Sequence, residues 1–194
     1  MLFKIGKWGA TGVETLMKTT ALTLQCLGLL ALLACLLAPR STCAADGGLN
    51  IGDTFPNLTA FGLEGDLPTT LKGHIVVVDF WASWCGPCKQ TFPLLDELHH
   101  RFSERGLIIL AINEDKSRAA MAEFLMEYPV RFKVLRDAKK KLAAEVNVPA
   151  LPTSYILSGE GKVLAIQSGA SIVQNRKRFI KEVEHWLETN PKKP

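Results

Sequence analysis

The sequence VDFWASWCGPCK occupies residues 78–89 and places two cysteines, Cys85 and Cys88, at the junction of two different patterns. Before it, residues 74–80 form an apolar run rich in β-branched side chains, which is typical of a strand buried on both faces of a sheet. After it, a helical pattern continues to about Arg105, where Gly106 is expected to end the helix. The two cysteines are therefore predicted to lie in the turn between a buried strand and a helix.

This position favours redox chemistry at the cysteine pair. At a helix N-terminus, Cys85 would face unpaired backbone N–H groups and the positive end of the helix dipole, and both favour a thiolate. Cys88 follows three residues later on the same face, within disulfide reach, and is expected to be the more buried partner that resolves a mixed disulfide. A static disulfide and half of a zinc site are the alternatives. The four histidines of the chain form no recognisable ligand pair.

The patterns on either side of this stretch indicate an α/β fold. Turn signals dominate residues 51–71, where we expect loops and short strands. Beyond the cysteines, strands are expected at 107–112, 130–135, 153–157 and 162–167, with a hairpin turn at 158–161, and helices at 117–128, 138–145 and 172–188. This order predicts a central sheet flanked by helices. The basic cluster at 139–141 is expected on the solvated face of its helix.

Residues 1–45 have the pattern of a targeting segment and not of a folded domain. No residue from 19 to 39 is charged, and small residues follow that run. Three fates fit this pattern: cleavage at the small residues, retention of residues 19–39 as a membrane anchor, and lipid attachment at Cys35 in a lipobox-like sequence. The internal Met17 is an alternative start. Each fate predicts export of residues 46–194 to the periplasm or another extracytoplasmic space, because basic residues precede the apolar run.

The two parts of the chain also differ in composition. Four of the 23 Lys and Arg residues and one of the 19 Asp and Glu residues lie in residues 1–45, which leaves 19 basic and 18 acidic residues in the domain. A near-neutral domain without a dense basic stripe gives nucleic-acid binding little support. Three of the five cysteines lie in the leader. One short-range pair in an exported domain is typical of a redox centre and not of a structural disulfide framework.

Residues 78–89 resemble the active-site segment of thioredoxins nearly residue for residue. Pro93 and the sequence LPT at 151–153 lie where that family has them, and the resemblance extends over most of residues 50–188. The N-terminal extension, the inserted helix at 117–128 and the leader are similar to the TlpA/ResA-like branch, whose domain is of the AhpC/TSA-redoxin type. The resemblance implies a thioredoxin-like fold with a central mixed β-sheet.

The resemblance also implies roles for particular residues. Cys85 would be the attacking cysteine, Cys88 the resolving one, and Asp79 the buried carboxylate that accepts the proton of the second cysteine. An acid inside an apolar strand is otherwise anomalous; a solvated strand end is the alternative. Pro152 would be a cis-proline beside the cysteines. Substrate contacts are expected at Trp84, Gly86, Pro87, Leu151 and Pro152.

Two positions depart from the pattern of the TlpA/ResA-like branch. Many of its members carry a glutamate three residues after the second cysteine and lack the strand aspartate, whereas this chain has Thr91 and retains Asp79. Proton handling is therefore expected to resemble that of ordinary thioredoxins. Members that act in cytochrome c maturation often have glutamate after the cis-proline, where this chain has Thr153, and this weakens a dedicated haem-protein role.

These observations predict an exported thiol–disulfide oxidoreductase that reduces protein disulfides, since Gly-Pro between the cysteines resembles the reducing members of the family. The expected partners are protein disulfides and a membrane thiol electron donor, with membrane contact only through the leader. No metal or cofactor is expected beyond the Cys85–Cys88 disulfide. A thiol peroxidase with antioxidant activity is one alternative, although related peroxidases place a lone cysteine after a Pro/Thr-rich turn. A metal-binding or copper-delivery module that uses both cysteines is an alternative from another class.

Overall fold

The computed structural model describes residues 48–190, so the predictions for the leader and for the boundary at residue 45 lie outside the described residues. Within that range the elements are η1 (Leu58–Phe61), β1 (Ile75–Trp81), α2 (Gly86–Phe102), β2 (Leu107–Asn113), α3 (Arg118–Glu127), β3 (Lys133–Arg136), α4 (Lys141–Glu145), β4 (Thr153–Leu157), β5 (Val163–Ser168), α5 (Ser171–Gln174) and α6 (Arg176–Thr189).

The five strands form one mixed sheet in the order β3-β2-β1-β4-β5, which confirms the predicted central mixed sheet. β1 is central: it pairs in parallel with β2, from Ile75 opposite Leu107, and antiparallel with β4, in which Ser154 lies opposite Asp79. β2 and β3 are parallel, and β4 and β5 form the predicted antiparallel hairpin. All seven residues of β1 are buried, as expected for a central strand covered on both faces.

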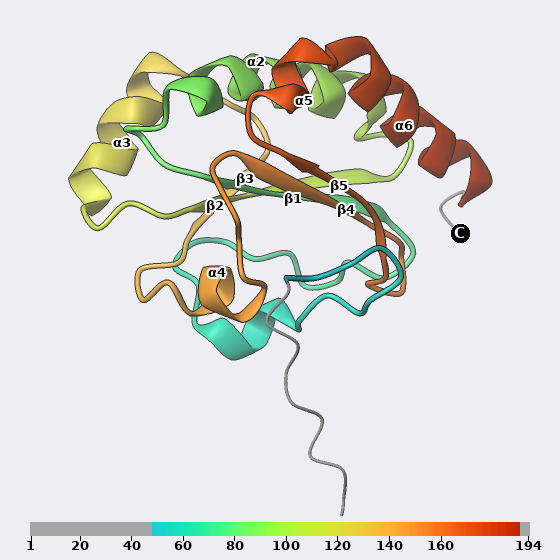
Figure 1. Ribbon diagram of the computed structural model, residues 1–194, viewed down its shortest axis with the longest axis horizontal. Helices are drawn as coiled ribbons and strands as arrows, with labels where there is room; N and C mark the ends of the chain where they lie inside the picture. The colour runs from blue at the N-terminus through green and yellow to red at the C-terminus, as the bar shows by residue number, and fades with distance from the viewer. Residues whose placement is uncertain (1–47, 191–194) are drawn as a thin grey trace, which may run out of the picture. The chain divides into compact units, whose positions relative to one another are not determined.

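Helices cover the sheet on both sides (Figure 1). α2, α3, α5 and α6 lie over one face, and α4 and η1 lie over the other. Because side chains alternate along a strand, β1 divides its residues between two cores. Val77 and Trp81 belong to the core under α2 and α6, whereas Val78 and Phe80 belong to the core on the side of α4.

An aromatic cluster fixes α2 and α3 against the end of β1. Trp81 contacts Phe92 of α2 and Phe124 of α3, with ring centroids 4.5 and 4.6 Å apart, and Phe92 and Phe124 are 4.9 Å from each other. Such tilted and edge-on aromatic pairs add to the free energy gained by burying the rings. The start of α2, which carries the cysteines, is therefore held by packing within one helical turn of the redox pair.

Two predicted helices have different bounds in the structure. α2 ends at Phe102, short of Arg105, and Gly106 turns the chain into β2 with a φ of 100°. α4 starts only at Lys141, because the Asp137 carboxylate accepts hydrogen bonds from the backbone N–H groups of the first three helical residues. The cluster at 139–141 is exposed as predicted, but only Lys141 is helical: Lys139 and Lys140 lie in the turn that leads into α4.

The remaining differences have local causes. The single helix expected at 172–188 is split into α5 and α6, because Asn175 has a non-helical conformation and donates its side-chain amide to the carbonyl of Ser171. The strand expected at 130–135 begins only at Lys133, since Phe132 instead packs against Phe92. In residues 51–71 the expected short strands are reduced to the isolated bridges Thr54–Lys162 and Glu64–Arg136, and η1 lies between them.

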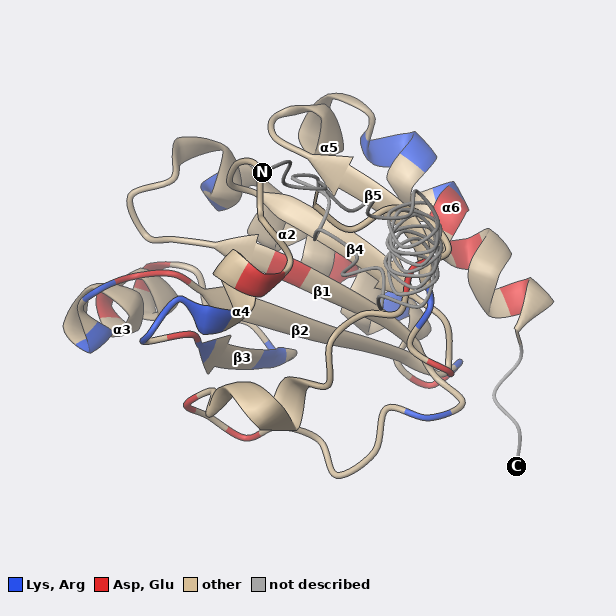
Figure 2. Ribbon diagram, turned by 60° about the horizontal axis from the view of Figure 1, so that its bottom comes forward, with Lys and Arg blue, Asp and Glu red and all other residues tan. Residues whose placement is uncertain are grey.

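Charged residues of both signs are interspersed over the described part of the chain, as Figure 2 shows for α3 and α6. Within residues 48–190 no helix combines the length and the apolar character needed to cross a bilayer.

Candidate functional site

The turn between β1 and α2 presents Cys85 as the N-cap of α2. Cys85 has an extended backbone (φ −82°, ψ 104°), and the backbone N–H of Cys88 donates a hydrogen bond to Cys85 Sγ over 3.2 Å. Pro87 follows within the first turn, where its missing N–H breaks no helical hydrogen bond. A negative charge on Cys85 Sγ would thus face backbone donors and the positive end of a 17-residue helix.

Cys85 and Cys88 form a disulfide with an S–S distance of 2.04 Å. Cys85 is 4% exposed and Cys88 is fully buried, so Cys88 is the more buried cysteine, as predicted. Between them, Gly86 is exposed and Pro87 is half-buried. A Cβ at Gly86 would meet nothing within 4 Å, so another chain has room to approach the disulfide from this side.

The strand aspartate is fully buried, which excludes the alternative of a solvated strand end. Side chains two residues apart in a strand lie on the same face, so Asp79 is on the face of β1 that carries Val77 and Trp81. These two residues belong to the core that includes Cys88 and the apolar side of α2. Ser154 Oγ donates to Asp79 Oδ1 over 2.5 Å, while Oδ2 has no partner among the described residues. Burial raises the pKa of Asp79 to about 7, and the Ser154 hydrogen bond opposes that rise.

This shift predicts how stability changes with pH. The pKa of Asp79 rises from 3.8 to about 7 on folding, so between these values the native state binds the proton that the unfolded chain releases. The free energy of unfolding should therefore fall as pH rises from about 4 to 7, by about 4 kcal/mol from this group. Asp79→Asn should remove this contribution to the pH dependence. The measurement is urea unfolding of the oxidised domain at pH 4.5 and at pH 8, values spanning about the same interval, which gives the free energy of unfolding at each pH.

Glu123→Gln is the matched control, because Glu123 is an exposed carboxylate on α3. It should keep the pH dependence of the wild-type domain. Equal stabilisation of Asp79→Asn at both pH values would contradict a raised pKa at this site.

The predicted substrate contacts come from two segments of the chain. The Leu151–Pro152 peptide bond is cis, as expected, and Pro152 is buried while Leu151 is half-buried. Trp84, which precedes Cys85, is 70% exposed. Trp84 and Leu151 line one shared pocket, although 67 residues of chain separate them. The two segments predicted to touch substrate are thus adjacent in space.

Position 91, where many TlpA/ResA-like sequences have glutamate, carries a buried threonine in α2. Thr91 is fully buried in α2, and its hydroxyl donates to the carbonyl of Pro87 over 3.3 Å. It supplies no titratable group, whereas Asp79 is a fully buried acid in the strand that leads to the cysteine turn.

Polar residues at the end of β2 were missed in the sequence. Asp115 is buried and accepts hydrogen bonds from both the backbone N–H and the hydroxyl of Ser83, each over 3.0 Å, and from Asn113 over 2.7 Å. These hydrogen bonds connect the turn before Cys85 to the end of β2.

Glu114, also at the end of β2, is 4% exposed. Its burial, and to a smaller extent the negative charge of Asp137, raise its pKa to about 8. The signal was the sequence NED directly after a buried strand, at the sheet edge that carries the cysteines.

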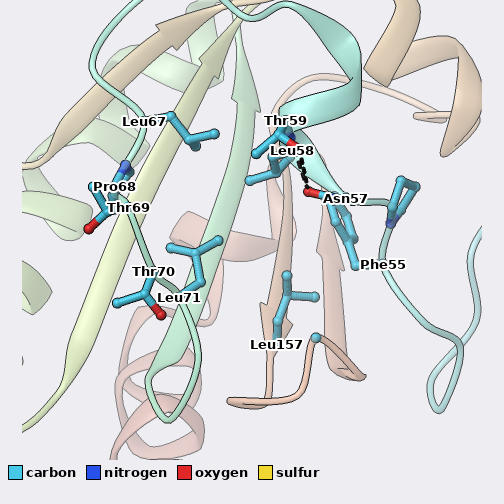
Figure 3. A pocket seen from close by; sticks show the side chains of 12 residues that line it. Phe55, Asn57, Leu58, Thr59, Leu67, Pro68, Thr69, Thr70, Leu71 and Leu157 are labelled. Atoms are coloured by element: carbon cyan, nitrogen blue, oxygen red, sulfur yellow. Dashed lines mark hydrogen bonds between the residues drawn. The ribbon is translucent and has the colours of Figure 1, made fainter.

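Other places in the described chain lack comparable chemistry. A cavity of about 240 Å³ on the far side of the molecule is lined by apolar and neutral polar side chains, among them Phe55, Leu67 and Leu157 (Figure 3), and includes none of the predicted site residues. Among residues 48–190 no three or more His, Cys, Asp or Glu side chains come together as metal ligands would.

Comparisons with known proteins agree with this geometry. Residues 51–166 match the model of the AhpC/TSA family. The chain is 31% identical over 137 residues to the thiol-disulfide oxidoreductase ResA of Bacillus anthracis, covering 70% of this chain and 79% of that protein. It is 30% identical over 165 residues to ResA of Bacillus subtilis, covering 81% and 92%.

A solved structure is similar as well. A Chlorobium tepidum protein, provisionally assigned as thiol:disulfide interchange protein DsbE, superimposes with a TM-score of 0.66 at 30% identity, covering 72% of this chain and 99% of that one. With its thioredoxin-like sheet and its cysteine pair at the start of α2, the chain belongs to the AhpC/TSA family and is a thioredoxin-like thiol–disulfide oxidoreductase of the ResA/DsbE type.

Proposed function

We propose that the domain reduces protein disulfides in an extracytoplasmic compartment, through a mixed disulfide on Cys85. The observation that carries the proposal is the position of Cys85 at the N-cap of α2, where the N–H of Cys88 donates to its sulfur. Hydrogen bonds to a thiolate and the helix dipole lower the free energy of the ionised form, which is the nucleophile of thiol–disulfide exchange.

In the first step, the Cys85 thiolate attacks one sulfur of a substrate disulfide. A bond forms between Cys85 Sγ and that sulfur, the substrate S–S bond breaks, and the second substrate sulfur leaves as a thiolate that takes up a proton. Trp84 and Gly86, which flank Cys85, are exposed, and Pro87 is half-buried. These three residues would form an apolar contact surface for the substrate next to the attacking sulfur. The backbone of the half-buried Leu151, before the cis-proline, would pair with an extended substrate segment.

In the second step, Cys88 attacks Cys85 Sγ. The Cys88 thiol gives its proton to Asp79, the Cys85–Cys88 disulfide forms, and the bond between Cys85 and the substrate sulfur breaks. That sulfur leaves as a thiolate and takes up a proton, so the substrate is released as a dithiol. Two electrons have then passed from the domain to the substrate, so a thiol donor must reduce the domain again. We propose a membrane dithiol protein as that donor, because the leader composition supports export and a non-cytoplasmic domain has no access to cytosolic reductants.

The direction of electron flow is tested by the reduction potential of the Cys85–Cys88 couple. We expect a value nearer the approximately −270 mV of thioredoxin than the approximately −120 mV of a strong oxidant such as DsbA. Equilibration with glutathione and dithiothreitol buffers, read by the fraction of free thiol, gives the value. A potential close to about −120 mV would reverse the proposed direction and make the domain an oxidant of protein thiols.

A further inference from the structure

A pocket of about 330 Å³ opens directly beside the active-site turn. Trp84 from the cysteine turn and Leu151 from the cis-proline turn form part of its wall. Lys140 and Glu114 are its charged lining residues, and the remaining wall comes from α4 and the segment after it, with Asn147 beside the apolar Ala143, Ala144, Val148 and Ala150. A protein segment whose disulfide is attacked by Cys85 would pass this pocket, since Trp84 immediately precedes Cys85.

One carboxyl group in this pocket lacks the hydrogen bonds that buried polar groups normally make. Glu114 lines the pocket, and its side chain is only 4% exposed. Its Oε1 is buried and has no hydrogen-bond partner within residues 48–190. Because a buried acceptor without a donor costs free energy, a donor brought in by an occupant of the pocket would be bound favourably.

Two acidic side chains and one basic side chain act on Glu114. Asp137 and Asp115 raise the pKa of Glu114, Lys140 lowers it, and burial is the largest cause of its rise to about 8. The carboxylate of Asp137 is occupied by the backbone of α4, and that of Asp115 by Ser83 and Asn113.

The two basic side chains nearby leave Glu114 without a partner. Arg136 pairs with Glu64 and donates to the carbonyls of Asp115 and Lys116. Lys140 lines the same pocket, but it is exposed and does not bond to Glu114 Oε1. Among Glu114, Asp115 and Asp137, Glu114 is therefore the one with a buried oxygen that lacks a hydrogen-bond partner. An ammonium or guanidinium group would supply both donors and the opposite charge.

We propose that this pocket receives a lysine or arginine side chain of the substrate protein, close in sequence to the attacked cysteine, and that Glu114 is the residue that selects it. The apolar walls fit the methylene stem of such a side chain, and the carboxyl group fits its charged end. This inference rests on the proposed function, because it assigns a substrate feature to the same site.

The test is a set of disulfide-linked peptides in which one residue near the attacked cysteine is either lysine or norleucine, scanned over the flanking positions. Norleucine keeps the apolar stem and removes the charge. At one position at least, the wild-type domain in its reduced form should reduce the lysine peptide about tenfold faster than the norleucine peptide. Glu114→Gln should bring that ratio close to one. Glu145→Gln, which removes an exposed carboxylate from the same α4 region, should keep the ratio.

The pH dependence of the ratio in the wild-type domain is a second measurement that needs no variant. Ionisation of Cys85 affects both peptides alike and cancels, so the ratio should rise from pH 6 to pH 9, around the pKa of Glu114 of about 8, as this carboxyl loses its proton. Equal rates for both peptides at every position, or an unchanged preference in Glu114→Gln, would overturn the inference and leave the proposed function standing. A wild-type domain that reduces no peptide at all would overturn both.

Discussion

Cys85→Ser is expected to abolish the reduction of insulin disulfides, with a loss of about a thousandfold or more. The structure makes Cys85 the cysteine with residual exposure and the one whose sulfur accepts a helix N-terminal hydrogen bond. A serine hydroxyl in that place is not ionised at neutral pH, so the covalent step loses its nucleophile. Precipitation of insulin chains with dithiothreitol as the electron source measures the rate.

Cys88→Ser is the matched variant, because it removes the other sulfur of the same disulfide by the same substitution. It should also lose turnover, but for a different reason: the first step proceeds and the mixed disulfide on Cys85 persists. Non-reducing electrophoresis and mass spectrometry should then find one substrate chain attached to Cys85. Substrate captured through Cys88 in the Cys85→Ser variant would show that the roles are reversed.

The strand that precedes the cysteines shows why so much of this fold could be predicted. A run of β-branched residues, a turn with two cysteines and an amphipathic helix each have a local signal, and all of them agree. The strands predicted at 74–80 and 107–112 are therefore found at 75–81 and 107–113, within one residue at each end. The ends of an element could not be predicted where a single tertiary contact determines them. β3 excludes Phe132, which packs on Phe92 instead, and α4 begins only at Lys141, where the Asp137 carboxylate accepts hydrogen bonds from its first backbone N–H groups.

The site was predictable to the extent that its residues are close in sequence or stand out in their surroundings. Asp79 stood out as an acid in an apolar strand, and the cysteines stood out by their spacing. Glu114 did not, since two acids after a strand also fit an ordinary solvated loop. The pocket it lines is completed by residues of α4, about 30 residues later in the chain, and a pairing over that separation leaves no local pattern.

Asp79→Asn is expected to slow the second chemical step at pH 7 about a hundredfold while leaving the first nearly unchanged. General bases commonly accelerate proton transfer by about 10²–10⁴-fold, and a carboxylate with a pKa of about 7 is half ionised at neutral pH. The reduced domain reacting with an aromatic disulfide such as dithiobis(nitrobenzoate) separates the steps. Attack by Cys85 releases one nitrothiolate, and attack by Cys88 on the mixed disulfide releases the second. Stopped-flow absorbance records both phases.

The pH profile distinguishes a proton acceptor from a residue that only shapes the site. In the wild-type domain the second phase should rise as Asp79 ionises, through about pH 7, and then level off. In Asp79→Asn the rate of the second phase should keep rising above pH 7, because hydroxide then removes the Cys88 proton, so the difference from the wild-type rate should shrink toward pH 9.

Ser154→Ala is an intermediate case. It removes the hydrogen bond that lowers the pKa of Asp79, so the rise in the rate of the second phase should occur at higher pH than in the wild-type domain. If the deficit of Asp79→Asn were the same at every pH, or if both phases slowed equally, the carboxylate would act only by holding the structure, and the proton of Cys88 would have to leave directly to water.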